Sequence, residues 1–138
     1  MNIALLLSPK VNTAYLDHDA TVRQGLEKFR AHGFTAVPVL DAEGYYKGII
    51  SEGDFLRCIL SEGSVAMKHM ESLCIKDIMT YDKRDPLGID ATVDQVTERL
   101  LDCNFVPITD ARGCFIGIVT RKKLLLYLRE KAANPVGA

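Results

Sequence analysis

Apolar positions follow the same helical spacing in two stretches of this 138-residue chain. They recur three and four residues apart, at Val22, Leu26 and Phe29 and again at Val93, Val96 and Leu100. This spacing places them on one face of an α-helix. A Thr-x-x-Gln sequence begins each stretch and can cap free backbone amides. We therefore expect helices over about 21–32 and 92–103, the first of them closed by Gly33.

A short β-rich run follows each helix, and a turn sequence divides it in two. The turns are Asp41-Ala42-Glu43-Gly44 and Asp110-Ala111-Arg112-Gly113. Each run therefore predicts a β-hairpin. Pro38 cannot donate a ladder hydrogen bond, so its position should lie at an edge or a bulge, where neighbouring backbone groups are open to a ligand. Short extended segments at about 13–16 and 86–89 precede the two helices.

A second helix is expected after each hairpin. Ser51 precedes one and Thr120 the other, and either hydroxyl can cap a helix start. The first turn after Ser51 is acidic, whereas the first turn after Thr120 is Arg121-Lys122-Lys123, which the helix dipole disfavours. Each half of the chain is therefore predicted to have the element order β-α-β-β-α. The expected fold class is α+β, with helices and strands mixed along the chain (α/β mixed).

The duplication extends to the residues themselves. Asp19-Ala20-Thr21-Val22 returns 71 positions later as Asp90-Ala91-Thr92-Val93, and Val37-Pro38 returns 69 positions later as Val106-Pro107. Two copies of one supersecondary unit therefore fill almost the whole chain. The expected organisation is a first repeat, a linker helix, a second repeat and a tail, over residues 1–62, 63–74, 75–131 and 132–138.

Composition and charge exclude several classes of protein. The chain is 48% hydrophobic and 25% charged, as in an ordinary globular protein, and its net charge of −1 argues against a nucleic-acid binder. No apolar run approaches the roughly 18 residues of a membrane span, and Met1–Leu7 lacks the basic start of a secretory signal, so we expect a cytoplasmic protein without membrane insertion. Four cysteines without a C-x-x-C pair predict buried thiols, and the spacing of the histidines predicts no metal site.

Four segments of the first copy occur in a characteristic order. They are Asp19-Ala20-Thr21-Val22, His32-Gly33-Phe34-Thr35-Ala36-Val37-Pro38-Val39, Asp41 to Gly44, and Gly48-Ile49-Ile50-Ser51-Glu52-Gly53-Asp54. This order, in duplicate over roughly residues 8–130, resembles the cystathionine-β-synthase-type repeat, or CBS domain. The resemblance implies two repeats packed sheet to sheet about a pseudo-two-fold axis, adenine nucleotides bound in clefts between them, and pairing into a homodimer.

The resemblance and the chemistry of a nucleotide together indicate ligand-binding residues in the first repeat. Backbone groups for the base would come from Thr13, Ala14, Tyr15, Thr35, Ala36, Val37 and Pro38. The Asp54 carboxylate can accept both ribose hydroxyls, and Ser51 with the helix-start amides suits a phosphate oxygen. The structural alternatives are that Asp54 completes a Ser-x-x-Asp capping box, that residues 35–38 are a core strand, and that Ser51 is only a cap.

The second repeat departs from this pattern at the acidic position. Lys123 stands where Asp54 stands in the first repeat, and a lysine donates hydrogen bonds but cannot accept them. We expect an asymmetric module, in which the first repeat holds the nucleoside while Thr120, Arg121 and Lys123 meet its phosphates. The alternative is that these cations are solvated surface charges.

Three functions are compatible with this sequence. The first is a regulatory sensor that binds AMP, ADP, ATP or cyclic di-AMP and signals to a separate effector protein, with no cofactor required. The second is a ligand-free interaction or oligomerisation module, which the missing carboxylate in the second repeat favours. The third is a small enzyme, which we do not expect because the chain lacks a Gly-rich phosphate loop, a metal cluster and a Ser/His or Cys/His arrangement in a supporting context.

Overall fold

The computed structural model describes residues 2–33, 35–62, 70–79 and 85–134. The chain divides into two compact units, one formed by Met1–Thr13 with Pro86–Ala138 and the other by Ala14–Asp85. We call them the C-terminal unit and the central unit. These units cut across the predicted repeat boundaries, because the first thirteen residues belong with the second repeat and the segment that follows the linker belongs with the first.

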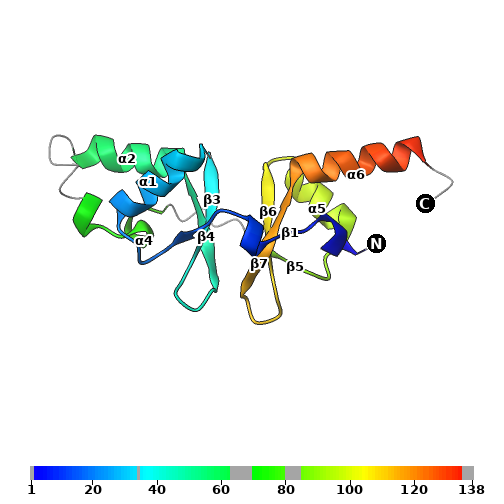
Figure 1. Ribbon diagram of the computed structural model, residues 1–138, viewed down its shortest axis with the longest axis horizontal. Helices are drawn as coiled ribbons and strands as arrows, with labels where there is room; N and C mark the ends of the chain where they lie inside the picture. Colours follow the sequence, from blue (N-terminus) through cyan, green and yellow to red (C-terminus); the bar gives the residue numbers. More distant parts are fainter. Residues whose placement is uncertain (1, 34, 63–69, 80–84, 135–138) are drawn as a thin grey trace. The chain divides into compact units, whose positions relative to one another are not determined.

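The central unit is a three-stranded sheet with helices against it (Figure 1). Its elements are β2 (Leu16–Asp17), α1 (Val22–His32), β3 (Ala36–Leu40), β4 (Tyr46–Ser51), α2 (Glu52–Glu62) and α4 (Ile75–Ile78). The strand order is β2-β3-β4, with β2 parallel and β4 antiparallel to β3. The predicted β-α-β-β-α order is therefore confirmed in this unit.

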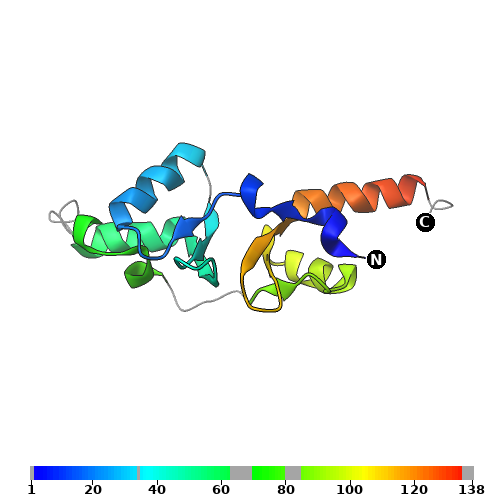
Figure 2. The ribbon, with the colours of Figure 1, turned by 60° about the horizontal axis from the view of Figure 1, so that its bottom comes forward.

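The C-terminal unit repeats this order and adds a strand. Its elements are η1 (Ile3–Leu6), β1 (Ser8–Pro9), η2 (Lys10–Asn12), β5 (Leu87–Gly88), α5 (Val93–Leu100), β6 (Phe105–Thr109), β7 (Phe115–Thr120) and α6 (Arg121–Ala133). The strand order is β1-β7-β6-β5. In both views α5 and α6 lie on one side of the β6–β7 hairpin (Figures 1 and 2).

The N-terminal residues are an integral part of the C-terminal unit. Ile3 and Leu6 are buried in its core, and β1 pairs antiparallel to β7 with Ser8 opposite Ile118. The sequence pattern does not predict this pairing, because two residues are too short a run to show a strand period. The sheet edge at β7 is thereby covered by chain from the opposite end of the sequence.

Helix capping follows the sequence closely. In α1 the Thr21 hydroxyl accepts from the Gln24 amide at 3.1 Å, and the Gln24 side chain accepts from the Thr21 amide at 3.0 Å. Gly33 closes α1 with φ 66°, which only glycine adopts without cost. The same box begins α5 at Thr92, but α5 ends at Leu100 and residues 101–102 form a turn, so the predicted end at 103 was wrong.

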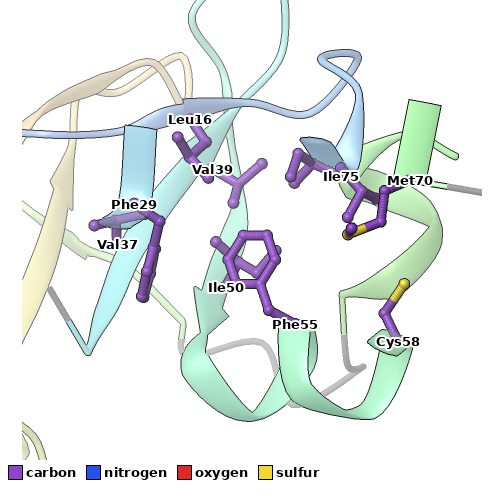
Figure 3. Close-up of a cluster of buried hydrophobic side chains, with 10 residues drawn as sticks. Leu16, Phe29, Val37, Val39, Ile50, Phe55, Cys58, Met70 and Ile75 are labelled. Carbon is purple, nitrogen blue, oxygen red and sulfur yellow. The ribbon is translucent and has the colours of Figure 1, made fainter. Parts of the chain in front are cut away.

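The core of the central unit draws on residues beyond the first repeat (Figure 3). Val39 and Ile50 of the sheet are fully buried, and the rings of Phe29 and Phe55 lie 5.1 Å apart between centroids. Met70 and Ile75 complete this core from the segment after α2. Backbone hydrogen bonds fix that segment against the start of α1, including one of 2.8 Å from the Val22 amide to the Leu73 carbonyl.

Pro38 lies at a locally open position, as its missing amide hydrogen requires. It pairs with Ile49 of β4, whereas the register of β2 with β3 begins one residue later, at Leu16 opposite Val39. The start of β3 is therefore paired on one side only, and the expectation of an edge position at Pro38 is confirmed in this local sense.

The structure confirms only part of the predictions for the linker helix and the cysteines. Of the predicted linker helix over 63–74, residues 70–72 are helical and residues 63–69 lie outside the described residues. The predicted end was wrong, because residue 73 is a bend and Cys74 forms an isolated bridge with Thr21. Cys58 is buried as expected, but Cys74, Cys103 and Cys114 are only partly buried, because each lies at a helix start or a turn. No helix within the described part of the chain has the length and apolar character needed to cross a membrane.

Candidate functional site

The carboxylate of Asp54 lies at the start of α2 with protein donors on both oxygens. Oδ2 accepts from the Ser51 amide at 2.9 Å and from the Ser51 hydroxyl at 3.3 Å, and Oδ1 accepts from the guanidinium of Arg57. The Asp54 side chain is 1% exposed, whereas that of Arg57 is 61% exposed. The bond to the Ser51 amide is the acidic half of a capping box, so the structural role foreseen for Asp54 is present.

The β3–β4 hairpin brings this carboxylate next to the open start of β3. Ala36 lies opposite Ser51 in the register of the hairpin. The Glu52 amide, at the first position of α2, donates to the Thr35 carbonyl at 3.0 Å. Because strand pairing and the helix start share these residues, the predicted base-binding backbone at 35–38 and the predicted ribose acceptor lie at one end of the hairpin.

A pocket of ≈ 380 Å³ opens beside Asp54 within the central unit. Its described lining combines polar and apolar side chains from α2 and from the 73–78 segment, namely Asp54, Arg57, Cys58, Ser61, Leu73, Asp77 and Ile78. A buried acceptor beside apolar walls suits a ligand that combines a hydroxyl-bearing ring with an apolar group.

The predicted residues at 13–15 are divided between the two units. Ala14 and Tyr15 belong to the central unit, where the Tyr15 carbonyl accepts from Lys28 Nζ at 2.8 Å and the same ammonium lies 5.1 Å from the Tyr15 ring centroid. Thr13 belongs to the C-terminal unit, where its hydroxyl donates to the Lys10 carbonyl at 3.0 Å. The ligand contacts predicted for these residues stay predictions.

The cationic start of α6 is held by acceptors within the C-terminal unit. Lys123 Nζ donates to the Leu7 carbonyl and to Ser8 Oγ, both at 3.3 Å, while the Thr120 hydroxyl accepts from the Lys123 amide at 3.1 Å. Arg121 Nε donates to the Leu100 carbonyl at 2.9 Å. These contacts offset the unfavourable helix dipole and show that Arg121 and Lys123 are more than solvated charges.

A second cluster of polar groups follows β2. Asp17, His18 and Asp19 bring one possible metal-ligand atom each to within 4.8 Å of one another, and His18 Nδ1 has no hydrogen-bond partner among the described residues. Lys76 Nζ already donates to Asp19 at 2.9 Å, and this bond lowers the pKa of Asp19 and raises the pKa of Lys76. The Asp19 carboxylate thus already has a cationic partner within the protein.

Of the seven described residues that line the pocket, sequence reasoning named only Asp54 as a ligand-binding residue. Arg57 stands three residues after Asp54, a spacing at which helical side chains meet, so this pair could have been read from the sequence. Asp77 and Ile78 could not, because they come from beyond the linker and reach the pocket only through the docking of the 70–79 segment.

Comparison with known proteins identifies this architecture. The sequence profile of the CBS domain matches residues 8–61 and 75–130, and the chain belongs to this family as a tandem pair of repeats. Over 95% of its length the chain is 29% identical to a CBS domain-containing protein of Dictyostelium discoideum, of which it covers 92%.

Solved CBS-pair structures share the fold. CbpB in complex with c-di-AMP aligns with a TM-score of 0.89 at 21% identity, over 99% of this chain and 90% of that one. The Listeria monocytogenes CbpB complex with c-di-AMP gives 0.82 at 24% identity, over 95% and 97%. CBSX2 in complex with AMP gives 0.75 at 21% identity, over 94% and 96%. At these identities the likeness concerns the fold.

Proposed function

We propose that this protein is a regulatory module that binds an adenine nucleotide at the pocket beside Asp54. The observation that carries the proposal is a nearly buried carboxylate at a helix start, beside a strand whose backbone is open on one side and next to a pocket of ≈ 380 Å³. CBS-pair proteins of the same fold are known in complex with c-di-AMP and AMP, which supports an adenine ligand here.

The chemistry of each group fits one part of such a ligand. Asp54 accepts ribose hydroxyls through charge-assisted hydrogen bonds. The backbone groups of Thr35 to Pro38 that β4 and the Glu52 amide leave open can face an adenine edge, with Pro38 contributing a carbonyl only. The ligand is AMP, ADP, ATP or cyclic di-AMP. We also propose that the phosphates contact Ser51, Thr120, Arg121 and Lys123. Nucleotide titration of Asp54→Ala and of Arg121→Ala tests the site, and an unchanged nucleotide affinity in both variants would contradict the assignment.

A thermal-shift screen of the full chain with AMP, ADP, ATP, cyclic di-AMP and GMP tests the function. A ligand present at 100 times its dissociation constant stabilises the folded state by about 2.7 kcal/mol, so a clear rise in Tm is expected with at least one adenine ligand and none with GMP. The absence of a shift with all four adenine ligands at millimolar concentration would contradict the proposal.

The ligand-free interaction module is the second candidate. The observation that favours it is that the Asp54 carboxylate already serves Ser51 and Arg57, as a purely structural cap would. Such a module would show no thermal shift in the same screen. In either case we infer a role without catalysis. For the nucleotide-binding candidate this role is regulatory: the ligand binds two conformations of the module with different affinity, and a separate effector protein responds to the conformation that the ligand favours.

We also propose that the protein forms a homodimer. Exposed leucines gather on two helices at equivalent positions of the repeats, with Leu56 on α2 56% exposed and Leu125 on α6 58% exposed. Beside Leu125 and Leu126 lies a groove of ≈ 490 Å³. Exposed apolar side chains on α2 and on α6 each mark an interaction surface of their own unit, and a second copy is the partner that every solution of the protein contains.

Charge insertion on the exposed apolar surface of α6 is expected to produce monomers. Leu125→Glu places a carboxylate in an interface that must exclude water, and we expect a dimer dissociation constant raised by about 30-fold or more. Light scattering after size exclusion over a concentration series measures it. Val11→Glu is the matched control, because Val11 is 89% exposed outside α2 and α6 and its change should leave the mass unaltered. A wild-type chain that is monomeric throughout would refute the dimer.

A further inference from the structure

The Asp54 carboxylate has three hydrogen-bond donors in place before any ligand arrives. Ser51 supplies two of them, both to Oδ2, and Arg57 supplies the third to Oδ1. An ionised carboxylate offers about four lone-pair sites, two on each oxygen. Oδ2 is therefore fully used, and Oδ1 retains a single site.

A ribose with free 2′ and 3′ hydroxyls brings two donors to this carboxylate. Asp54 can accept both only if one of its present donors leaves. The Ser51 amide cannot leave, because it is fixed where β4 meets α2. The Ser51 hydroxyl can rotate away, but this frees a site on Oδ2 only. On Oδ1 the donor that a second hydroxyl must replace is Arg57, whose side chain is flexible and 61% exposed. We propose that Arg57 competes with the second ribose hydroxyl for Asp54 and thereby sets the preference of this pocket among adenine ligands. This inference rests on the proposed function of the pocket.

The burial of Asp54 gives this competition its strength. An ion pair between two exposed side chains contributes little, because water solvates both partners. The Asp54 side chain is 1% exposed, so its oxygens depend on protein donors, and an acceptor left without one is costly. Arg57 should therefore stay on Oδ1 until a ligand hydroxyl replaces it.

The competition depends on how many hydroxyls the ligand offers. A ligand with one free ribose hydroxyl uses the open site on Oδ1 and leaves Arg57 in place. Cyclic di-AMP is such a ligand, because each 3′ oxygen is part of a phosphodiester and only the 2′ hydroxyl is free. The Arg57 contact therefore disfavours mononucleotides relative to cyclic di-AMP.

The second repeat supports treating Asp54 and Arg57 as a pair. The positions 69 residues later are Lys123 and Leu126, so the acceptor and its competitor are both absent there. Lys123 instead donates to the Leu7 carbonyl and to Ser8 Oγ. The second repeat thus lacks both the carboxylate that would accept a ribose hydroxyl and the arginine that would compete for that carboxylate.

Neutral nucleosides isolate this effect from contacts to phosphate. Adenosine has both the 2′ and the 3′ hydroxyl, whereas 2′-deoxyadenosine has only the 3′ hydroxyl of this pair, and the two nucleosides share the same 5′ hydroxyl. We expect Arg57→Ala to bind adenosine about fivefold or more tightly than the wild type, and 2′-deoxyadenosine within about twofold, by calorimetric titration. Arg30→Ala removes an exposed cation from α1 of the same unit and should change neither affinity.

The possible outcomes separate this inference from the proposed function. If the wild type binds adenosine and Arg57→Ala binds it equally or more weakly, the proposed competition is wrong, whereas the proposed nucleotide site still stands. Failure of both proteins to bind any adenine ligand overturns both proposals. If Arg57→Ala does not fold, Arg57→Gln replaces it, because glutamine keeps a neutral donor at the same place. We expect Arg57→Gln to bind adenosine more tightly than the wild type, by a smaller factor, and to bind 2′-deoxyadenosine unchanged. An unchanged affinity for adenosine would likewise contradict the competition.

Discussion

Asp54→Asn is expected to weaken AMP binding by at least about tenfold and up to about a hundredfold. A hydrogen bond to a charged group contributes about 1.5–3 kcal/mol, and each 1.4 kcal/mol changes affinity about tenfold. In the variant the single amide oxygen is needed by the Ser51 amide, which leaves an NH₂ group to face hydroxyls that also donate. Calorimetric titration of the purified chain with AMP measures the loss.

The matched control for this variant is Glu52→Gln. It removes the same charge from the same turn of α2, but Glu52 is exposed and does not line the pocket, so its affinity for AMP should stay within about twofold of the wild type. The ligand offers a second control. The analogue 2′,3′-dideoxy-AMP lacks both hydroxyls and should bind the wild type and Asp54→Asn alike. If Asp54→Asn binds AMP as tightly as the wild type, Asp54 is not part of the binding site.

Gly117→Ala is expected to destabilise the C-terminal unit by about 3 kcal/mol or more. Gly117 has φ 154°, and a Cβ atom added there would lie 2.2 Å from the Ser8 carbonyl oxygen and 3.1 Å from Pro9 Cα. Both neighbours are backbone atoms of β1, so β1 must move away from β7 for the methyl group to fit. Urea denaturation monitored by circular dichroism measures the loss of stability.

Gly33→Ala separates the steric part of this effect from backbone strain. Gly33 also has positive φ, at 66°, but no atom lies within 4 Å of an added Cβ, so the expected cost is only about 1–2 kcal/mol. Hydrogen exchange over residues 115–120 should rise in Gly117→Ala and not in Gly33→Ala. Equal losses of stability in the two variants would show that the approach of β1 to β7 contributes nothing.

The local sequence was sufficient for most secondary structure. Thr21 with Gln24, and Thr92 with Gln95, form the capping boxes that their spacing predicts, because such a box involves only residues within one helical turn. The end of α5 was misjudged for the opposite reason. The Leu100 carbonyl accepts from Arg121, which lies 21 residues away, and no local pattern reveals that partner.

The candidate site shows the same division. The sequence singles out Ser51 and Asp54 because strand end and helix start adjoin there. It also places Lys123 at the equivalent position of the second repeat. That Asp54 would be almost fully buried with Arg57 on one oxygen depends on packing around α2, which hydrophobic periodicity does not describe. The pocket wall at Asp77 depends on the return of the chain after the linker.

The sequence by itself determined the duplicated β-α-β-β-α order, the family and the asymmetry between Asp54 and Lys123, since these follow from residue identity and short-range spacing. Only the tertiary structure decided that residues 1–13 complete the second repeat and that the 70–79 segment completes the first. The physical reason is that a two-residue strand such as β1 has no period of its own. Its place is fixed by the sheet edge that it pairs with and by the apolar side chains that it helps to bury.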